Sequence, residues 1–265
     1  MTKPRNFTSA NATGTQSIHR VLSILKKVAQ YNETGVRLSQ LAKELELHTA
    51  TTHRMLSILV KEGWVTMDPV SKAYHLGYEI FAIGTKANQF KLKDLFHGVL
   101  ELIADQTGDT TYLVTRSGND ALCLDRIVGK FPVQVLTFEI GHQRPLGIGA
   151  GSLALLSAMP ADQAELITKE NEERYKIFNR TGEEVRLAVK QSRRLGYGLS
   201  VKTVNPDTVG VGVAVTNSDG KAVAAISVAG ITKRMGPTKR DNIVKLIKAE
   251  LAKIDRSSLT GAKAW

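Results

Sequence analysis

Apolar residues in the first third of the chain recur at helical spacing. The first stripe consists of Ile18, Val21, Leu22, Leu25 and Val28. This stripe predicts a helix over residues 15–32 that ends before Gly35. A short second helix with Ser39 as its N-cap and a third helix over residues 49–62 follow, separated by a turn at residues 46–48.

After the third helix the pattern changes from helical spacing to short apolar runs. Residues 64–67 and 73–76 are strand-like, and residues 68–72 join them as a turn that contains Lys72. Two helices, a turn, a third helix and a β-hairpin in this order are typical of a winged helix-turn-helix. We place this domain at residues 15–76, after a flexible tail at residues 1–14.

The remaining two thirds of the chain predict a second domain with both strands and helices. A helical pattern over residues 77–92 predicts a linker helix, and another helical stripe begins at Leu95. Beyond it we expect strands at residues 111–115, 121–128, 133–138, 209–216 and 222–229, and helices at residues 152–158, 183–195 and 240–254. The sequence Asn217-Ser218-Asp219-Gly220 predicts a hairpin turn between the last two strands. Strands before and after central helices indicate an α+β domain over residues 93–256, with a second tail at residues 257–265.

Composition and charge narrow the class of protein. The chain of 265 residues has one cysteine and no apolar run long enough to span a membrane, so we expect a soluble, cytoplasmic protein without disulfides. A net charge of +11 favours polyanions such as nucleic acid. Residues 1–86 are the more basic part by density, with 11 Lys and Arg against 6 Asp and Glu. A basic surface that is simply solvated is the alternative interpretation.

The third predicted helix has an apolar face and a small, polar face. The inner face contains Thr52, Met55, Leu56 and Leu59, and the outer face contains Ala50, Arg54, Ser57 and Lys61. The outer face suits a DNA major groove, because small residues allow close approach and arginine can make a bidentate contact to a base. We therefore expect DNA contacts from Ser39, Gln40, Thr49, Ala50, Thr51, His53, Arg54 and Lys72. An ordinary amphipathic helix with a solvated face is the alternative.

Segments along the whole chain resemble the IclR-type transcriptional regulators. In the N-terminal part they are Ser17-Ile18-His19-Arg20-Val21-Leu22, Leu38-Ser39-Gln40-Leu41-Ala42, Thr51-Thr52-His53-Arg54-Met55-Leu56, Glu62-Gly63-Trp64-Val65 and Tyr74-His75-Leu76-Gly77. In the C-terminal part they are Thr107-Gly108-Asp109-Thr110, Arg144-Pro145-Leu146, Ala150-Gly151, Gly196-Tyr197 and Ala225-Ile226-Ser227-Val228. The resemblance covers about residues 16–255 and implies a regulator that binds double-stranded operator DNA. It also implies a GAF-like effector domain that binds a small organic acid.

We further expect at least a homodimer, or a dimer of dimers, because one recognition helix reads too few bases for genomic specificity. The apolar positions of the predicted linker, Ile80, Phe81, Ile83 and Ala87, could supply the contact between copies.

The resemblance also implies a set of pocket residues. Family members that bind small oxo-acids have an acidic residue, a cysteine and two serines where this chain has Ser200, Gly210, Ser227 and Ala229. Because one of these four polar groups is kept, we expect a larger and less polar pocket, suited to a bulkier acid such as an aromatic one. Backbone N–H groups of the turn before residue 151 should face the ligand carboxylate. The expected effector-binding residues are Leu146, Ala150, Gly151, Ser200, Thr208, Gly210, Ser227 and Ala229.

Motifs for catalysis, metals and cofactors are weak. Gly149-Ala150-Gly151-Ser152-Leu153-Ala154 fits the dinucleotide pattern G-x-G-x-x-A, but Arg144-Pro145-Leu146 interrupts the strand that should precede it, and Glu170 follows no second strand. Ser152 lacks the flanking glycines of a nucleophile elbow, and Cys123 lies in an apolar run as an inert thiol. We expect no catalytic residue, metal or cofactor.

Two alternative functions stay open at this point. One is a GAF-like metabolite-binding module or an enzyme whose basic N-terminal domain is incidental. The other is an RNA-binding regulator, which the lack of interleaved basic and aromatic residues disfavours.

Overall fold

The computed structural model describes residues 13–86, 88–255 and 259. The chain forms two compact units, Met1–Ala87 and Asn88–Trp265. The N-terminal unit consists of α1 (Thr13–Gln30), α2 (Leu38–Glu44), α3 (Thr49–Lys61), β1 (Val65–Met67), β2 (Tyr74–Leu76) and α4 (Tyr78–Gly84). Within the described ranges, no helix combines the length and apolarity needed to cross a lipid bilayer.

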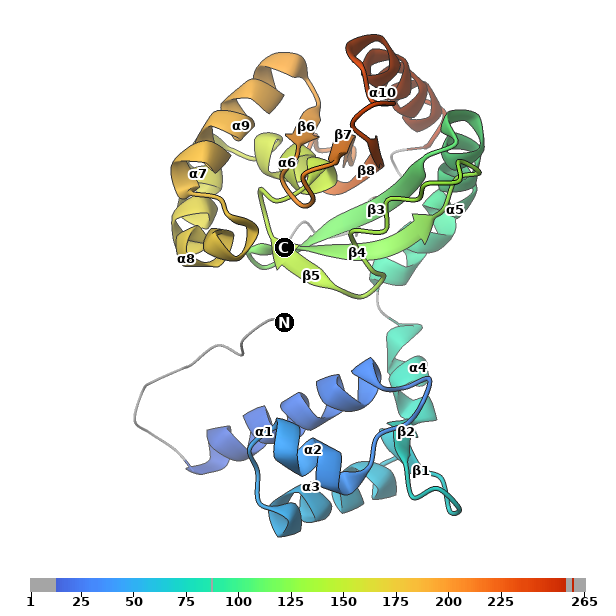
Figure 1. The fold of residues 1–265 in the computed structure, drawn as a ribbon, viewed down its shortest axis with the longest axis vertical. Coiled ribbons are helices and arrows are strands. Elements are labelled where there is room, and N and C mark those ends of the chain that lie inside the picture. Colours follow the sequence, from blue (N-terminus) through green and yellow to red (C-terminus); the bar gives the residue numbers. More distant parts are fainter. Residues whose placement is uncertain (1–12, 87, 256–258, 260–265) are drawn as a thin grey trace. The chain divides into compact units, whose positions relative to one another are not determined.

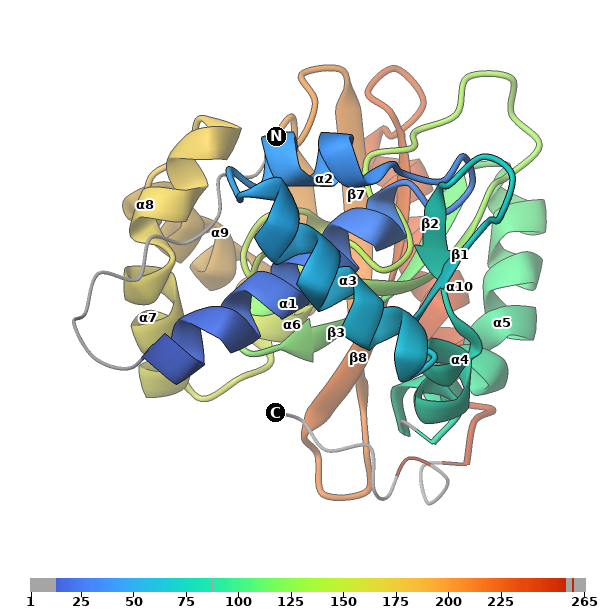
Figure 2. The same ribbon diagram turned by 90° about the horizontal axis from the view of Figure 1, so that it is seen from below.

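The N-terminal unit closes around a small apolar core. Ile24 and Val28 of α1, Leu41 of α2 and Leu56 of α3 are fully inaccessible to solvent. β1 and β2 pair antiparallel as a hairpin, and Figures 1 and 2 show α3 on the outside of this unit. This arrangement confirms the predicted winged helix-turn-helix. One detail differs: α2 begins at Leu38 with Arg37 as its N-cap, so Ser39 lies inside the first turn.

The predicted linker helix over residues 77–92 is interrupted in the structure. α4 ends at Gly84, and a second helix, α5 (Asn88–Thr107), continues through the stripe that was predicted as a separate helix. The start of α4 is fixed by close backbone contact, because a Cβ added at Gly77 would lie 2.0 Å from the carbonyl oxygen of Gly63. The division between the two units falls between α4 and α5.

The C-terminal unit is built on a six-stranded sheet of order β5-β4-β3-β8-β7-β6, in which every neighbouring pair is antiparallel. Its strands are β3 (Thr110–Ser117), β4 (Asp120–Ile127), β5 (Gln143–Pro145), β6 (Gly198–Val201), β7 (Thr208–Thr216) and β8 (Ala222–Ile231). Its helical segments after α5 are α6 (Ala150–Ser157), α7 (Ala161–Glu170), α8 (Glu172–Tyr175), η1 (Lys176–Phe178), α9 (Gly182–Leu195) and α10 (Pro237–Leu251).

The two faces of this sheet bury different cores. α5 and α10 cover one face, where Phe96 and Ile247 pack with Ile226 of β8. α6 packs on the other face with α9 against it, and Figure 1 shows α7, α8 and α9 on this side. Ala225 and Ser227 of β8 face α6, since alternate residues of a strand point to opposite faces. The sheet and its two helical layers confirm the predicted α+β class.

The hairpin between β7 and β8 forms where the sequence placed it. Asn217 donates a backbone hydrogen bond to Lys221, and Gly220 adopts a φ of 75°, which favours glycine.

The strand predicted over residues 133–138 is wrong. Residues 132–142 form an irregular segment, called the strap below. It has no ladder of strand hydrogen bonds and is held by side chains and by single backbone hydrogen bonds. The hydroxyl of Tyr112 donates to the Val135 carbonyl and accepts a hydrogen bond from the Thr137 N–H at 3.3 Å. Gly141 N donates to the Cys123 carbonyl at 2.8 Å, which fastens the far end of the strap to β4.

Candidate functional site

The solvent-facing side of α3 is small and polar in its first two turns, and the apolar residue Ile58 is exposed farther along the helix. Thr49, Ala50, His53 and Arg54 are exposed, and Thr51 is half-buried. The predicted inner residues, Thr52, Met55, Leu56 and Leu59, are all buried. The structure therefore leaves four of the five candidate DNA-contacting side chains of α3 accessible in the first two turns of the helix.

The first turn of α3 is suited to an anion. It contains no acidic residue, and the side chain of the N-cap residue His48 makes no hydrogen bond to the helix. Backbone N–H groups of a first helical turn lack partners within the helix and carry the positive end of its dipole. A DNA phosphate is the type of group that such a helix end binds.

Gln40 has a structural partner that the sequence did not reveal. Its Nε2 donates to Glu44 Oε1 at 3.0 Å, and the same carboxylate binds Lys27 at 2.9 Å and the Tyr31 hydroxyl at 2.8 Å. These hydrogen bonds, led by that from Lys27, lower the pKa of Glu44 to about 2. The cluster joins α1 to α2, whereas Ser39 next to it is exposed and unconstrained by this network.

The hairpin presents Lys72 from a tightly structured turn. Asp68 Oδ1 accepts backbone N–H bonds from Val70 at 2.8 Å and Ser71 at 2.7 Å, and these bonds lower the pKa of Asp68. Lys72 is exposed and has a φ of 58°. The turn geometry therefore fixes the direction of the lysine relative to the hairpin.

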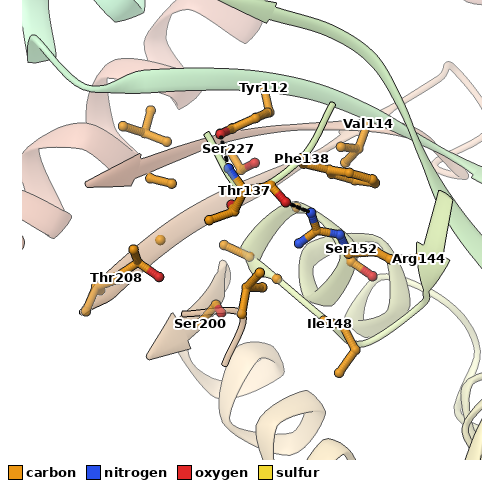
Figure 3. Close-up of a pocket in the computed structure, with 18 residues that line it drawn as sticks. Tyr112, Val114, Thr137, Phe138, Arg144, Ile148, Ser152, Ser200, Thr208 and Ser227 are labelled. Carbon is orange, nitrogen blue, oxygen red and sulfur yellow. Dashed lines mark hydrogen bonds between the residues drawn. The ribbon is translucent and has the colours of Figure 1, made fainter. Parts of the chain in front are cut away.

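A cavity lies between α6 and the sheet of the C-terminal unit (Figure 3). Its empty space is about 480 Å³ including the open mouth. Seven of the eight expected effector-binding residues line it: Ala150, Gly151, Ser200, Thr208, Gly210, Ser227 and Ala229. The other lining residues were not predicted from the sequence; they are Tyr112, Val114, Thr137, Phe138, Arg144, Ile148, Gly149, Ser152, Val204, Val209 and Val228.

Leu146, the eighth expected residue, does not line the cavity. Its side chain is fully buried in the core beneath α6, and its carbonyl accepts a 2.6 Å hydrogen bond from the Tyr175 hydroxyl. The turn that follows is folded on itself, because Gly147 N donates to Ser152 Oγ at 2.8 Å. Leu146 therefore supports the turn from behind.

Glycines in the cavity wall bring α6 close to the strands. A Cβ added at Gly210 would lie 3.2 Å from the Cβ of Ala150, and one at Gly151 would lie 2.7 Å from Val114 Cγ2. The space expected from the missing side chain of Gly210 is thus partly taken up by the approach of the helix.

Arg144 is the charged residue among those that line the cavity. Its residue surface is 7% exposed, its guanidinium lies 3.7 Å from the centroid of the Phe138 ring, and one Nη donates to the Thr137 carbonyl. Burial lowers the pKa of Arg144 to about 10, so the group keeps its charge at neutral pH. The sequence shows an arginine before a glycine-rich turn, but its burial depends on the strap that folds over it.

Cys123 lies on β4 beneath the strap. The residue is 1% exposed, and its Sγ is 4.0 Å from the Phe138 carbonyl. Burial raises the pKa of the thiol to about 12. A protonated, inaccessible thiol is a poor nucleophile.

Two family descriptions match the chain. The IclR helix-turn-helix domain matches residues 17–69, and the description "Bacterial transcriptional regulator IclR C-terminal" matches residues 85–256. The HTH-type transcriptional regulator KipR of Bacillus subtilis is 26% identical over 242 residues, which cover 88% of this chain and 96% of KipR. XynR of Escherichia coli, also an HTH-type transcriptional regulator, is 26% identical over 86% of this chain and 90% of its own length.

Solved structures share the fold. An IclR transcriptional regulator from Alicyclobacillus acidocaldarius superposes with a TM-score of 0.75 at 23% identity and covers 92% of this chain and 98% of its own. An IclR homologue from Microbacterium hydrocarbonoxydans, solved with 4-hydroxybenzoate, superposes with a TM-score of 0.76 at 17% identity over 92% of this chain and 99% of its own. The two matched domains, in the order and fold described above, show that this chain belongs to the IclR family of bacterial transcriptional regulators.

Proposed function

We propose that this regulator binds operator DNA through α3 and the β1–β2 hairpin, and that a small organic acid in the cavity changes its affinity for DNA. The observation that carries the effector part is a buried cation, Arg144, in a small and otherwise uncharged cavity. Such a cavity selects an anion with an apolar body. The related protein solved with 4-hydroxybenzoate supplies a chemically suitable first probe.

The DNA interface combines charge with shape. Lys72 and the first turn of α3 would hold phosphates, while Ala50, His53 and Arg54 would lie in the major groove. Phosphate contacts make binding salt-dependent, whereas contacts to base edges provide preference for one sequence. Ser39 and Thr51 would add hydrogen bonds at the border of the groove.

The protein is proposed to act by binding and to catalyse no reaction. The hydroxyl of Ser152 is engaged by the turn at Gly147, and the Cys123 thiol is buried and protonated. A bound acid can change DNA affinity only if it binds two states of the protein with different affinities. A compound that fills the cavity equally well in both states would therefore be no effector.

Fluorescence anisotropy with DNA from upstream of the gene tests this proposal. We expect DNA binding that weakens as salt rises and that exceeds binding to scrambled DNA, and a change in DNA affinity when an acid from a small panel is present. The panel contains acetate, pyruvate, benzoate and 4-hydroxybenzoate, each recovered afterwards and analysed for chemical change. Equal affinity for operator and scrambled DNA would contradict the regulator, and chemical conversion of an acid would indicate an enzyme.

We also propose that a second copy of this chain covers the exposed apolar face of α4. Tyr78 is 88% exposed and Phe81 is 73% exposed, while Ile83 is about half exposed. One α3 helix spans too few base pairs for genomic specificity, so two copies should bind half-sites spaced by whole turns of about 10 base pairs.

Sedimentation of the full chain checks the assembly. Phe81→Glu should shift the protein toward the monomer, because a charge in the contact is left without a partner. Val70→Glu is the control, because Val70 is a similarly exposed apolar residue at the tip of the hairpin. A wild-type protein that stays monomeric in the presence of operator DNA would contradict the dimer.

A further inference from the structure

We propose that Arg144 binds the carboxylate of the effector and makes the cavity specific for acids with a single anionic end and a less polar body. This inference rests on the proposed function and extends it to the residue that selects the ligand. It assigns the anion-binding role to a side chain, where the sequence favoured the backbone N–H groups of the turn before α6.

Arg144 is the one arginine or lysine that is buried among the described residues. Arg174, Arg186 and Arg234 keep 30%, 26% and 29% of their side chains exposed, yet each is paired with a carboxylate. Arg144 is more deeply buried, and among the described ion pairs none includes it. Burial of a cation without an anion is energetically unfavourable. A site that holds such a cation open to a cavity is suited to an anion that arrives from solution.

The guanidinium is held in one orientation before any ligand binds. Stacking on Phe138 fixes the plane of the group, and the bond to the Thr137 carbonyl uses one nitrogen. Arginine has five N–H donors, so others remain for a carboxylate. A Cβ at Gly149 would lie 3.3 Å from Arg144 Nη1, which places the guanidinium beside the N-terminal end of α6. The helix dipole and the side chain therefore favour negative charge in the same corner.

The rest of the lining indicates the ligand body. Figure 3 shows Arg144 on one side of the cavity and Thr208 and Ser200 on the other. Apolar side chains, including Val114 and Ile148, lie among the lining residues. This distribution suits a carboxylic acid with an apolar middle and a hydroxyl or oxo group at the far end.

Isothermal titration with matched acids and amides tests the assignment. The probes are acetate, pyruvate, benzoate and 4-hydroxybenzoate, each compared with its neutral amide. Wild-type protein should bind at least one acid more tightly than its amide by roughly 10- to 100-fold, the value of a charge-assisted hydrogen bond. Arg144→Gln should remove this preference and leave amide affinity unchanged, and Arg144→Lys should restore part of it.

Arg126→Gln is the matched control. Arg126 also donates to a strap carbonyl, that of Phe138 at 3.5 Å, but it does not line the cavity. This variant should keep the preference for the acid, which separates loss of an anion-binding group from loss of a strap contact. The assignment is overturned if Arg144→Gln binds acids as wild type does, if Arg126→Gln loses the preference equally, or if wild type binds no probe acid at about 10 mM.

Titrations are performed without DNA, so their outcome is independent of operator binding. A protein that binds the acid through Arg144 but shows no DNA preference would refute the proposed regulator and leave the ligand assignment intact. A protein that prefers operator DNA but binds acids and amides equally would refute the assignment of Arg144 and leave the proposed regulator intact.

Discussion

Arg54 projects from the exposed face of α3, where an arginine can reach a base edge. Arg54→Ala should weaken operator binding by roughly 1–3 kcal/mol and relax the preference at one base pair. Lys61→Ala removes an equal charge from the far end of the same helix. This variant should weaken binding to operator DNA and to scrambled DNA to a similar extent. Anisotropy titrations on both DNAs, with single base-pair replacements, measure the difference. Equal weakening of both DNAs by Arg54→Ala would show a role in charge alone.

At the scale of single residues, the sequence predicted exposure on α3 well and the cavity less completely. The α3 face follows from helical periodicity, which is a local property. Arg144 was missed as a ligand group because its burial comes from contact with Phe138, a residue on the strap that the sequence assigned to a strand. Leu146 was placed in the pocket because the resemblance to family members gives chain position and no side-chain direction.

At the scale of elements, Gly77 controls how the hairpin continues into α4. The backbone oxygen of Gly63 occupies the place of any Cβ at this position, so Gly77→Ala should destabilise the N-terminal unit by about 2 kcal/mol or more. Gly98→Ala is the contrasting variant, because nothing lies within 4 Å of a Cβ on this exposed part of α5. It should stabilise the C-terminal unit by up to about 1 kcal/mol through helix propensity. Denaturant unfolding followed by circular dichroism measures both, and a destabilising Gly98→Ala or a neutral Gly77→Ala would contradict the packing described.

His97 links α5 to β4 in a way that depends on pH. Its Nδ1 lies 2.6 Å from Asp125 Oδ2, and the hydrogen bond and charge of Asp125 raise the pKa of His97. A raised pKa in the folded state means that the stabilisation is complete below the usual histidine pKa of about 6.5 and is lost as pH rises through the higher value. Melting temperatures of the C-terminal unit should therefore fall over this range.

His97→Gln should flatten that part of the pH profile, since glutamine does not titrate. Glu139 and His142 form a similar but exposed pair at 3.2 Å, and His142→Gln serves as the control. If the melting temperatures of wild type and His97→Gln changed with pH in the same way, the contact between His97 and Asp125 would not contribute to the pH dependence of stability.

Among the elements, the hairpin β7–β8 and helix α3 were predicted from local signals, a turn of Asn and Gly and a clear helical period. The prediction of a strand over residues 133–138 was wrong because alternation of apolar and polar residues also occurs in the strap, whose backbone groups bond to side chains in place of a neighbouring strand. Short edge strands such as β5 and β6 carry too few residues for a periodic signal, and their pairing depends on distant strands.

At the scale of the whole molecule, the two units have separate cores. The core that contains Ile24 and Leu56 shares no residue with the cores that contain Phe96 or Leu153. Calorimetry should therefore show two transitions, with the smaller N-terminal unit unfolding at the lower temperature. Operator DNA should raise the temperature of the N-terminal transition. A bound acid at 100 times its Kd should stabilise the C-terminal unit by about 2.7 kcal/mol and so raise the temperature of the other transition. A single transition that both ligands raise equally would contradict independent cores.

This division into two domains was the part of the architecture that the sequence predicted most directly, because hydrophobic spacing changes character along the chain. The boundary was less well placed. The break after Gly84 interrupts an apolar pattern that continues on both sides, so the pattern alone predicted one helix.

The rate at which the buried thiol beneath the strap is chemically labelled reports on opening motions of the C-terminal unit. Cys123 is the single cysteine of the chain, so every modification by a thiol reagent reports from this one position. A reagent can reach Sγ only when the strap or the sheet edge opens, and the labelling rate then follows the population of that open form. An acid that binds Arg144 should stabilise the closed form of the strap. The labelling rate should then fall in proportion to the fraction of cavities that the acid occupies. Time courses of modification would thus measure effector binding in the native protein, without heat, denaturant or DNA.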